Sequence, residues 1–262
     1  MCHVSPAPFV FVQCRPAGVI ADDERATIER LGGLREGESL HSLMLFEDPD
    51  VDPARDLDLD AYAGVIISGS PYSAVEENEA SDPARAHMYA RVARLARTLI
   101  ERDIPTLGLC YGLQMLAVAQ GERLIDTVPE DLQAVSVHLG EAAAADPVCR
   151  GLAPTIRSFV GHTYALERTP PGATLLGRGE YCTQQLLRWG DNVYGTQFHP
   201  EITTAGMKLR IDTYAGHYYN ADEARDVIDR CMSQDVTSSN AMISAFVDRY
   251  RGYGSVTTPA AV

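Results

Sequence analysis

Residues 104–119 read IPTLGLCYGLQMLAVA, and this stretch decides the fold. Its first part, Ile104 to Leu109, is a short apolar run of the kind that forms a buried strand. Its last part, Met115 to Ala119, is typical of a helix packed on a sheet. Cys110 lies between them with a glycine two residues away on either side, which predicts a sharp strand-to-helix turn. Because the positive end of the following helix favours a thiolate, the stretch predicts a reactive cysteine.

Cys110 is also compatible with a buried structural thiol, since free cysteine is among the most buried residue types. A second motif favours catalysis: residues 194–201 read YGTQFHPE. A thiol nucleophile needs a base, for which His199 is suited, and the base needs an orienting acceptor, for which Glu201 is suited. The residues before His199 form a predicted strand, so the histidine falls at its carboxyl end, where open parallel sheets form active sites.

These two motifs together resemble those of the class I glutamine amidotransferases, a family with a Cys-His-Glu triad. Residues 65–73 (VIISGSPYS) resemble the family's oxyanion loop, and residues 158–164 (SFVGHTY) resemble its histidine-bearing segment. Residues 183–185 followed by 193–201 resemble its closing hairpin. The resemblance covers roughly residues 8–205. It is strongest to the free-standing subgroup similar to the glutaminase part of GMP synthase.

The resemblance implies that the substrate is L-glutamine. Cys110 would attack the carboxamide carbon, His199 would transfer the proton to the departing nitrogen, and a γ-glutamyl thioester would remain until water releases glutamate. Glu201 would hold the imidazole and stabilise its charged form.

The resemblance also implies an oxyanion hole and two substrate contacts. The oxyanion hole would use the backbone N–H groups of Gly69 or Ser70 and of Tyr111, each worth about 3–4 kcal/mol of barrier. Gln114, one turn into the helix, and His162 would contact the bound substrate.

Two departures from the family pattern matter for function. Ser70 stands where many members have a second glycine, and a positive φ there would strain a serine. Residues 131–139 (DLQAVSVHL) show no equivalent of the family's Gly-x-Glu-x-Gly segment, which helps hold the amino acid end of the substrate. A looser pocket would admit larger γ-glutamyl conjugates.

Length and patterning predict one α/β domain with an extension. The 262 residues, 45% of them hydrophobic, are ample for a single core. Strand and helix patterns alternate early and short strands follow late, which predicts a mostly parallel central sheet with helices on both faces. The resemblance implies a flavodoxin-like form of this fold. We expect the amidotransferase domain over 8–205, a helical extension packed on it over 206–252, and flexible ends at 1–7 and 253–262.

Charge and composition exclude several classes of function. The net charge of −14 argues against nucleic acid as a partner, because phosphates would be repelled. No apolar run reaches 18 residues and Met1 to Ser5 lack a signal pattern, so we expect a cytoplasmic protein without a membrane span.

The sequence predicts no metal site and no disulfide. The six cysteines are widely spaced without a Cys-x-x-Cys pair, and the cytosol is reducing. The acidic segment from Glu47 to Asp60 fits no calcium-loop pattern and is predicted to be a solvated loop.

Three functions remain open. The chain has no P-loop run for activating an acceptor, so ammonia would pass to a separate synthase subunit. We expect no cofactor. A stand-alone γ-glutamyl hydrolase would use the same triad on a larger leaving amine. A non-catalytic regulatory module is disfavoured because Cys110, His199 and Glu201 are all present.

Overall fold

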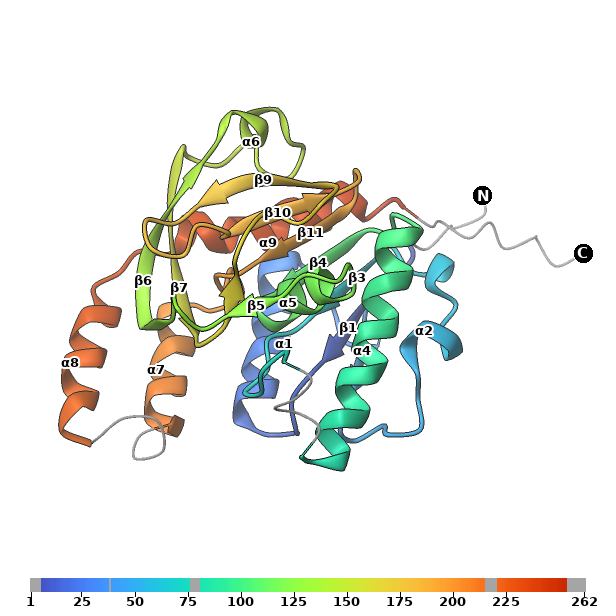
Figure 1. Ribbon diagram of the computed structural model, residues 1–262, viewed down its shortest axis with the longest axis horizontal. Helices are drawn as coiled ribbons and strands as arrows, with labels where there is room; N and C mark the ends of the chain where they lie inside the picture. The colour runs from blue at the N-terminus through green and yellow to red at the C-terminus, as the bar shows by residue number, and fades with distance from the viewer. Residues whose placement is uncertain (1–5, 38, 76–80, 215–220, 254–262) are drawn as a thin grey trace, which may run out of the picture.

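The computed structural model describes residues 6–37, 39–75, 81–214 and 221–253, and a nine-stranded sheet runs through this part of the chain (Figure 1). The strand order is β2-β1-β3-β4-β11-β10-β9-β6-β7. The strand bounds are β1 (Phe9–Gln13), β2 (Leu40–Met44), β3 (Gly64–Ile67), β4 (Thr106–Leu109), β6 (Glu130–Leu139), β7 (Thr155–His162), β9 (Ala173–Arg178), β10 (Leu186–Trp189) and β11 (Val193–Thr196).

The sheet is parallel in one half and antiparallel in the other. Strands β2, β1, β3, β4 and β11 run parallel to one another. Strands β10, β9, β6 and β7 continue the sheet in antiparallel pairs. Parallel neighbours need long crossovers, which the early helices provide, whereas the late strands follow one another too closely for that. The predicted triad residues Cys110 and His199 follow β4 and β11, which are neighbours in the parallel half.

Helices cover both faces of the sheet, so the α/β fold class predicted from the sequence is confirmed. One apolar cluster joins β1 and β4 to α1 and α9, and a second joins β1 and β3 to α4 and α5 on the opposite face. The alternation of side chains along a strand explains this, since Phe9 and Phe11 belong to the first cluster and Val10 and Val12 to the second. The helix bounds are α1 (Val19–Gly32), α2 (Pro53–Asp56), α4 (Pro83–Glu101), α5 (Tyr111–Val118), α6 (Glu141–Ala145), α7 (Thr204–Tyr214), α8 (Ala221–Met232) and α9 (Thr237–Tyr250).

The acidic segment predicted to be a solvated loop is partly helical. That prediction was wrong for residues 53–56 in α2 and for residues 59–60, which belong to the short 3-10 helix η1 (Leu59–Ala61). Asp52 caps α2 by accepting a hydrogen bond from the backbone N–H of Ala54, and Pro53 begins the helix. Arg94 of α4 pairs with Asp52 at 2.8 Å. The buried Arg91 guanidinium donates to the backbone carbonyls of the same segment, which is therefore anchored to α4.

Short elements went unpredicted. Strands β5 (Leu124–Ile125) and β8 (Ala165–Leu166) pair in a separate two-stranded sheet, and α6 is a single short helix. Segments of two to five residues carry too little periodicity to be seen in a sequence.

The C-terminal helices pack on the rest of the molecule. Helices α7 and α8 contact each other, and α8 contacts β6, as the lower left of Figure 1 shows. Helix α9 packs against α1 and β7. Helix α7 ends at Tyr214. Residues 215–220 of the predicted helical extension lie outside the described residues, as do 1–5 and 254–262 of the predicted flexible ends. No helix in the described part of the chain is long and apolar enough to cross a membrane.

Candidate active site

Cys110 lies at the turn between β4 and α5 with φ 48° and ψ −94°, a conformation that non-glycine residues rarely adopt. Two backbone bonds hold it there. Its N–H donates to the carbonyl of Thr196 at 2.6 Å, and its carbonyl accepts from the N–H of Gln114 at 3.0 Å. Such strain persists only where the surrounding structure enforces it, and it is common at active sites. The sharp turn predicted from the sequence is therefore confirmed.

The two flanking glycines are required by close packing. A Cβ on Gly108 would lie 2.7 Å from the carbonyl carbon of Gly112, and one on Gly112 would lie 2.8 Å from the carbonyl oxygen of Ile67. These are backbone atoms that cannot rotate away. The glycines therefore let α5 approach β4 and β3 closely enough to place Cys110 at the carboxyl edge of the sheet.

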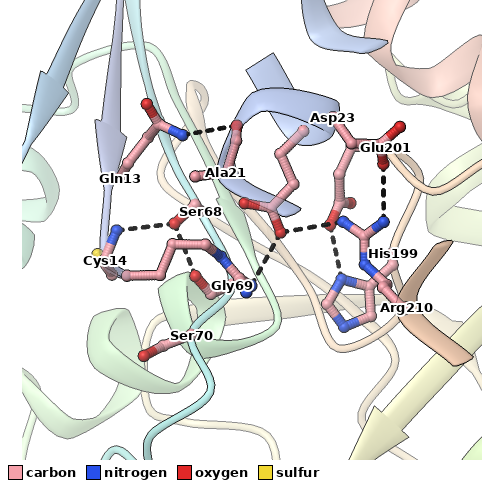
Figure 2. Close-up of polar contacts among 12 residues, drawn as sticks. Gln13, Cys14, Ala21, Asp23, Ser68, Gly69, Ser70, His199, Glu201 and Arg210 are labelled. Atoms are coloured by element: carbon pink, nitrogen blue, oxygen red, sulfur yellow. Dashed lines mark hydrogen bonds and ion pairs between the residues drawn. The ribbon is translucent and has the colours of Figure 1, made fainter. Parts of the chain in front are cut away.

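His199 and Glu201 form a buried pair (Figure 2). The Nδ1 atom of His199 lies 2.6 Å from Oε1 of Glu201. Cys110 lies close enough to the ring to help raise the pKa of His199. The backbone N–H of His199 donates to the carbonyl of Phe159 at 2.9 Å, which fixes the start of this segment. The three residues of the predicted triad are thus brought together from β4 and the segment after β11.

The charges of this pair stabilise each other. Burial disfavours the charged form of His199, but the Glu201 carboxylate and Cys110 outweigh it and raise the pKa of His199 to about 10. Burial likewise opposes the charge on Glu201, yet His199 and Arg210 hold the pKa of that carboxyl below its usual range. An imidazolium at neutral pH beside the cysteine follows from this arrangement.

The predicted oxyanion loop follows β3 and touches the histidine. A Cβ on Gly69 would lie 3.1 Å from Cε1 of His199, so the backbone here runs against the imidazole. Ser68 anchors the loop, because its hydroxyl accepts from the N–H of Cys14 at 2.9 Å and donates to the carbonyl of Gly69 at 2.6 Å. Among the described non-glycine residues only Asp103 and Cys110 have positive φ, so Ser70 carries no left-handed strain.

Tyr111 and Gln114 lie in the first turn of α5. Tyr111 begins the helix directly after the cysteine. The Gln114 amide donates to the carbonyl of Tyr164 at 2.6 Å and to Oε1 of Gln197 at 3.2 Å. Gln197 in turn has its Nε2 atom 3.4 Å from Sγ of Cys110. The sequence analysis did not single out Gln197. Its position, directly after β11 and two residues before His199, could have indicated a place in the site.

His162 contacts a buried carboxylate that the sequence did not indicate. Its Nε2 atom lies 2.9 Å from Oε2 of Glu130, and the amide of Gln185 donates to the same oxygen at 2.8 Å. Glu130 stands directly before residues 131–139, which show no equivalent of the family's Gly-x-Glu-x-Gly segment. The carbonyl of Gln185 accepts from the N–H of Gln197 at 2.9 Å, which connects this group to the wall around Cys110.

A buried charge network links α1 and α7 close to Glu201 (Figure 2). Glu24 pairs with Arg15 at 2.9 Å and with Arg210 at 3.2 Å, and Arg210 also pairs with Asp23 at 2.8 Å. Arg15 follows β1, and its guanidinium lies 3.6 Å from where a Cβ on Gly69 would stand. Sequence reasoning missed this network because its members come from three separate segments.

Comparison with known proteins identifies the family. The model of the family Glutamine amidotransferase class-I matches residues 41–215, and the chain belongs to this family. One relative, from Sulfurisphaera tokodaii, is a single subunit of a glutamine-hydrolysing GMP synthase. It is 26% identical over 173 residues, which are 65% of this chain and 82% of the relative. The longer glutamine-hydrolysing GMP synthase of Thermosipho melanesiensis is 29% identical over 140 residues, 53% of this chain and 24% of the relative.

A solved structure shows the same fold. A glutamine amidotransferase from Thermotoga maritima superposes with a TM-score of 0.71, covering 94% of this chain and 98% of that one, at 20% sequence identity. The chain is thus a class I glutamine amidotransferase related to the glutaminase subunit of GMP synthase.

Proposed function

We propose that this protein hydrolyses L-glutamine to glutamate and ammonia through a thioester on Cys110. The observation that carries the proposal is the strained cysteine beside His199, whose imidazole is held by the buried Glu201. Thiol-dependent acyl transfer requires a nucleophile, a base within hydrogen-bond reach and a group that orients the base.

His199 holds the proton taken from the Cys110 thiol, because its imidazole has a raised pKa. The Cys110 thiolate attacks the carboxamide carbon, forming the C–S bond while the carbonyl electrons move to oxygen. His199 gives its proton to the departing nitrogen as the C–N bond breaks, and ammonia leaves. Water then attacks the thioester, His199 takes a proton from that water, and glutamate is released with the thiolate restored.

Three further roles complete the mechanism. The backbone N–H groups of Gly69 or Ser70 and of Tyr111 stabilise the oxyanion. Gln114 contacts the bound glutamine from the first turn of α5. His162, held by Glu130 at 2.9 Å, is the second substrate contact.

We further propose that the ammonia is consumed by a synthase subunit on a separate polypeptide. The relatives whose names describe one subunit of GMP synthase support this, because such a name denotes one component of an enzyme with several. The longer GMP synthases support it as well, since the matched part of this chain corresponds to about a quarter of their length.

Glutamate release from L-glutamine tests the proposal. Wild type is compared with Cys110→Ala and with Cys149→Ala, which removes a buried thiol of the first apolar cluster. We expect turnover that Cys110→Ala lowers by at least about 1,000-fold and that Cys149→Ala retains. Addition of a candidate synthase subunit with its own substrates tests the transfer of ammonia.

The alternatives predict different results. Cleavage of γ-glutamyl amides that depends on Cys110, without glutamine turnover, would replace the glutaminase by a γ-glutamyl hydrolase. Absence of turnover on every substrate, with and without synthase candidates, would favour the hypothesis of a non-catalytic module.

A further inference from the structure

Glu130, His162 and Cys182 form a cluster of metal-ligating groups. One ring nitrogen, one carboxylate oxygen and the thiol sulfur of these residues all lie within 4.8 Å of one another. They come from the start of β6, the end of β7 and the loop between β9 and β10. We call these three residues the 130/162/182 cluster.

The cluster is buried and its polar groups are only partly satisfied. The side chains of His162 and Glu130 are 2% and 4% exposed, and Cys182 is fully buried. His162 Nδ1 and Gln185 Oε1 are buried without a hydrogen-bond partner in the described structure. An unsatisfied buried polar atom costs about 1–3 kcal/mol, so such atoms are rare unless a ligand or water completes them.

The donor set is that of a transition-metal site. Thiolate, imidazole and carboxylate together are the ligands of zinc, whereas calcium and magnesium take oxygen alone. Zinc lies about 2.3 Å from sulfur and about 2.0–2.1 Å from nitrogen and oxygen, so its ligands stand closer together than 4.8 Å. Zinc binding therefore requires the three ligand atoms to move closer together.

A fourth polar group and an entry path accompany the cluster. The Gln185 amide already donates to Glu130, so its unpartnered Oε1 is placed to accept from a metal-bound water. A polar groove lined by Glu130, Asp131 and Tyr181 reaches the surface next to the cluster.

We propose that the 130/162/182 cluster binds one zinc ion through three protein ligands, with a water in the fourth position. On binding, the Cys182 thiol releases its proton to solvent and the sulfur bonds to the metal. The proposed zinc site shares His162 with the proposed substrate site, so its test measures metal binding and not turnover.

Titration with Co²⁺ tests the site without measuring activity, because a cobalt–thiolate bond gives a charge-transfer absorption band. All proteins carry Cys110→Ala, so that the catalytic thiol cannot supply the band. We expect one equivalent of Co²⁺ to produce the band, Zn²⁺ to displace it, and the affinity to rise about tenfold per pH unit, as release of one proton requires.

Two variants and a control locate the metal. Adding Cys182→Ser abolishes the band, whereas adding Cys231→Ser, a buried thiol against β6, leaves it unchanged. His162→Gln keeps the thiol and lowers the affinity by at least about tenfold, since even outer partners of a metal site are worth that much. Circular dichroism and melting curves show which variants fold. If Cys182→Ser does not fold, the affinity of His162→Gln for Co²⁺ decides whether the cluster binds the metal.

The proposal is overturned by absence of the band in the Cys110→Ala protein, or by a band that persists without Cys182. Equal affinity in a folded His162→Gln protein also overturns it.

Discussion

His199 and Glu201 show how two buried groups hold charges that burial alone would remove. The 2.6 Å contact between Nδ1 and the carboxylate is charge-assisted, and bonds of this type are about twice as strong as neutral ones. Removing either partner leaves the other as an unpaired charge in a buried site. This costs more free energy of folding than the loss of an exposed ion pair.

The stability of this pair depends on pH in a direction that follows from its pKa values. The pKa of His199 is about 10 in the folded protein and about 6.5 when unfolded, so its contribution is complete below about pH 6.5 and is lost as pH rises through 10. The lowered pKa of Glu201 acts in the opposite sense, since its contribution is lost only as pH falls below about 4.3.

We predict that Glu201→Gln lowers stability at pH 7 and flattens its decline between pH 7 and 10, because the variant lacks the carboxylate that raises the pKa of His199. Melting temperatures measured across this range check the prediction. Glu101→Gln, at an exposed position in α4, is the control and keeps the wild-type slope. Parallel curves for wild type and Glu201→Gln would show that the pair does not control the slope.

At the scale of elements, the catalytic turn depends on three segments meeting within backbone contact. Helix α5 lies against β4 and β3, and Gly108 and Gly112 are the points of closest approach. The strain at Cys110 is sustained by this packing rather than by the cysteine itself.

We predict that Gly112→Ala destabilises the protein by about 1–3 kcal/mol or more, since the new methyl meets the Ile67 carbonyl at 2.8 Å. The helix must shift, so turnover falls as well. Urea unfolding measures the first effect and glutamate release the second. Gly151→Ala is the matched control, because its Cβ meets nothing within 4 Å and the change stays within about 0.5 kcal/mol. Equal stability of the two variants would contradict the packing argument.

At the scale of the whole molecule, the C-terminal helices belong to the core. Phe246 of α9 is fully buried, and its ring packs against those of Phe9, Tyr194 and Tyr250. Strand β1, strand β11 and helix α9 therefore share one apolar cluster although they lie far apart in the sequence. The segment bearing His199 follows β11 directly, so this packing also supports the site.

We predict that Phe246→Ala costs about 3–5 kcal/mol and that the whole protein still unfolds in one transition. Trp189 in β10 is the only tryptophan, so its fluorescence reports the sheet while far-UV circular dichroism reports the helices. The two midpoints should fall together. Asp248→Asn, on the exposed side of α9, should leave both unchanged. A shifted helical signal with an unshifted fluorescence midpoint would mean that α9 unfolds on its own.

The sequence by itself determined the parts of this protein that depend on neighbouring residues. The strand, turn and helix around Cys110 follow from local apolar runs and two glycines, and His199 and Glu201 are two residues apart. The α/β class follows from the alternation of such segments. The roles proposed for Gly69, Ser70, Tyr111, Gln114 and His162 remain predictions.

Only the tertiary structure decided which distant side chains share a buried space. The 130/162/182 cluster, the network of Arg15, Glu24 and Arg210, and the contact of Gln197 with Cys110 join residues from separate strands and helices. No local spacing marks them, because each of these residues comes singly from a different segment of the chain. The physical reason is that burial and hydrogen-bond partners are properties of the packed sheet, which periodicity along the chain does not encode.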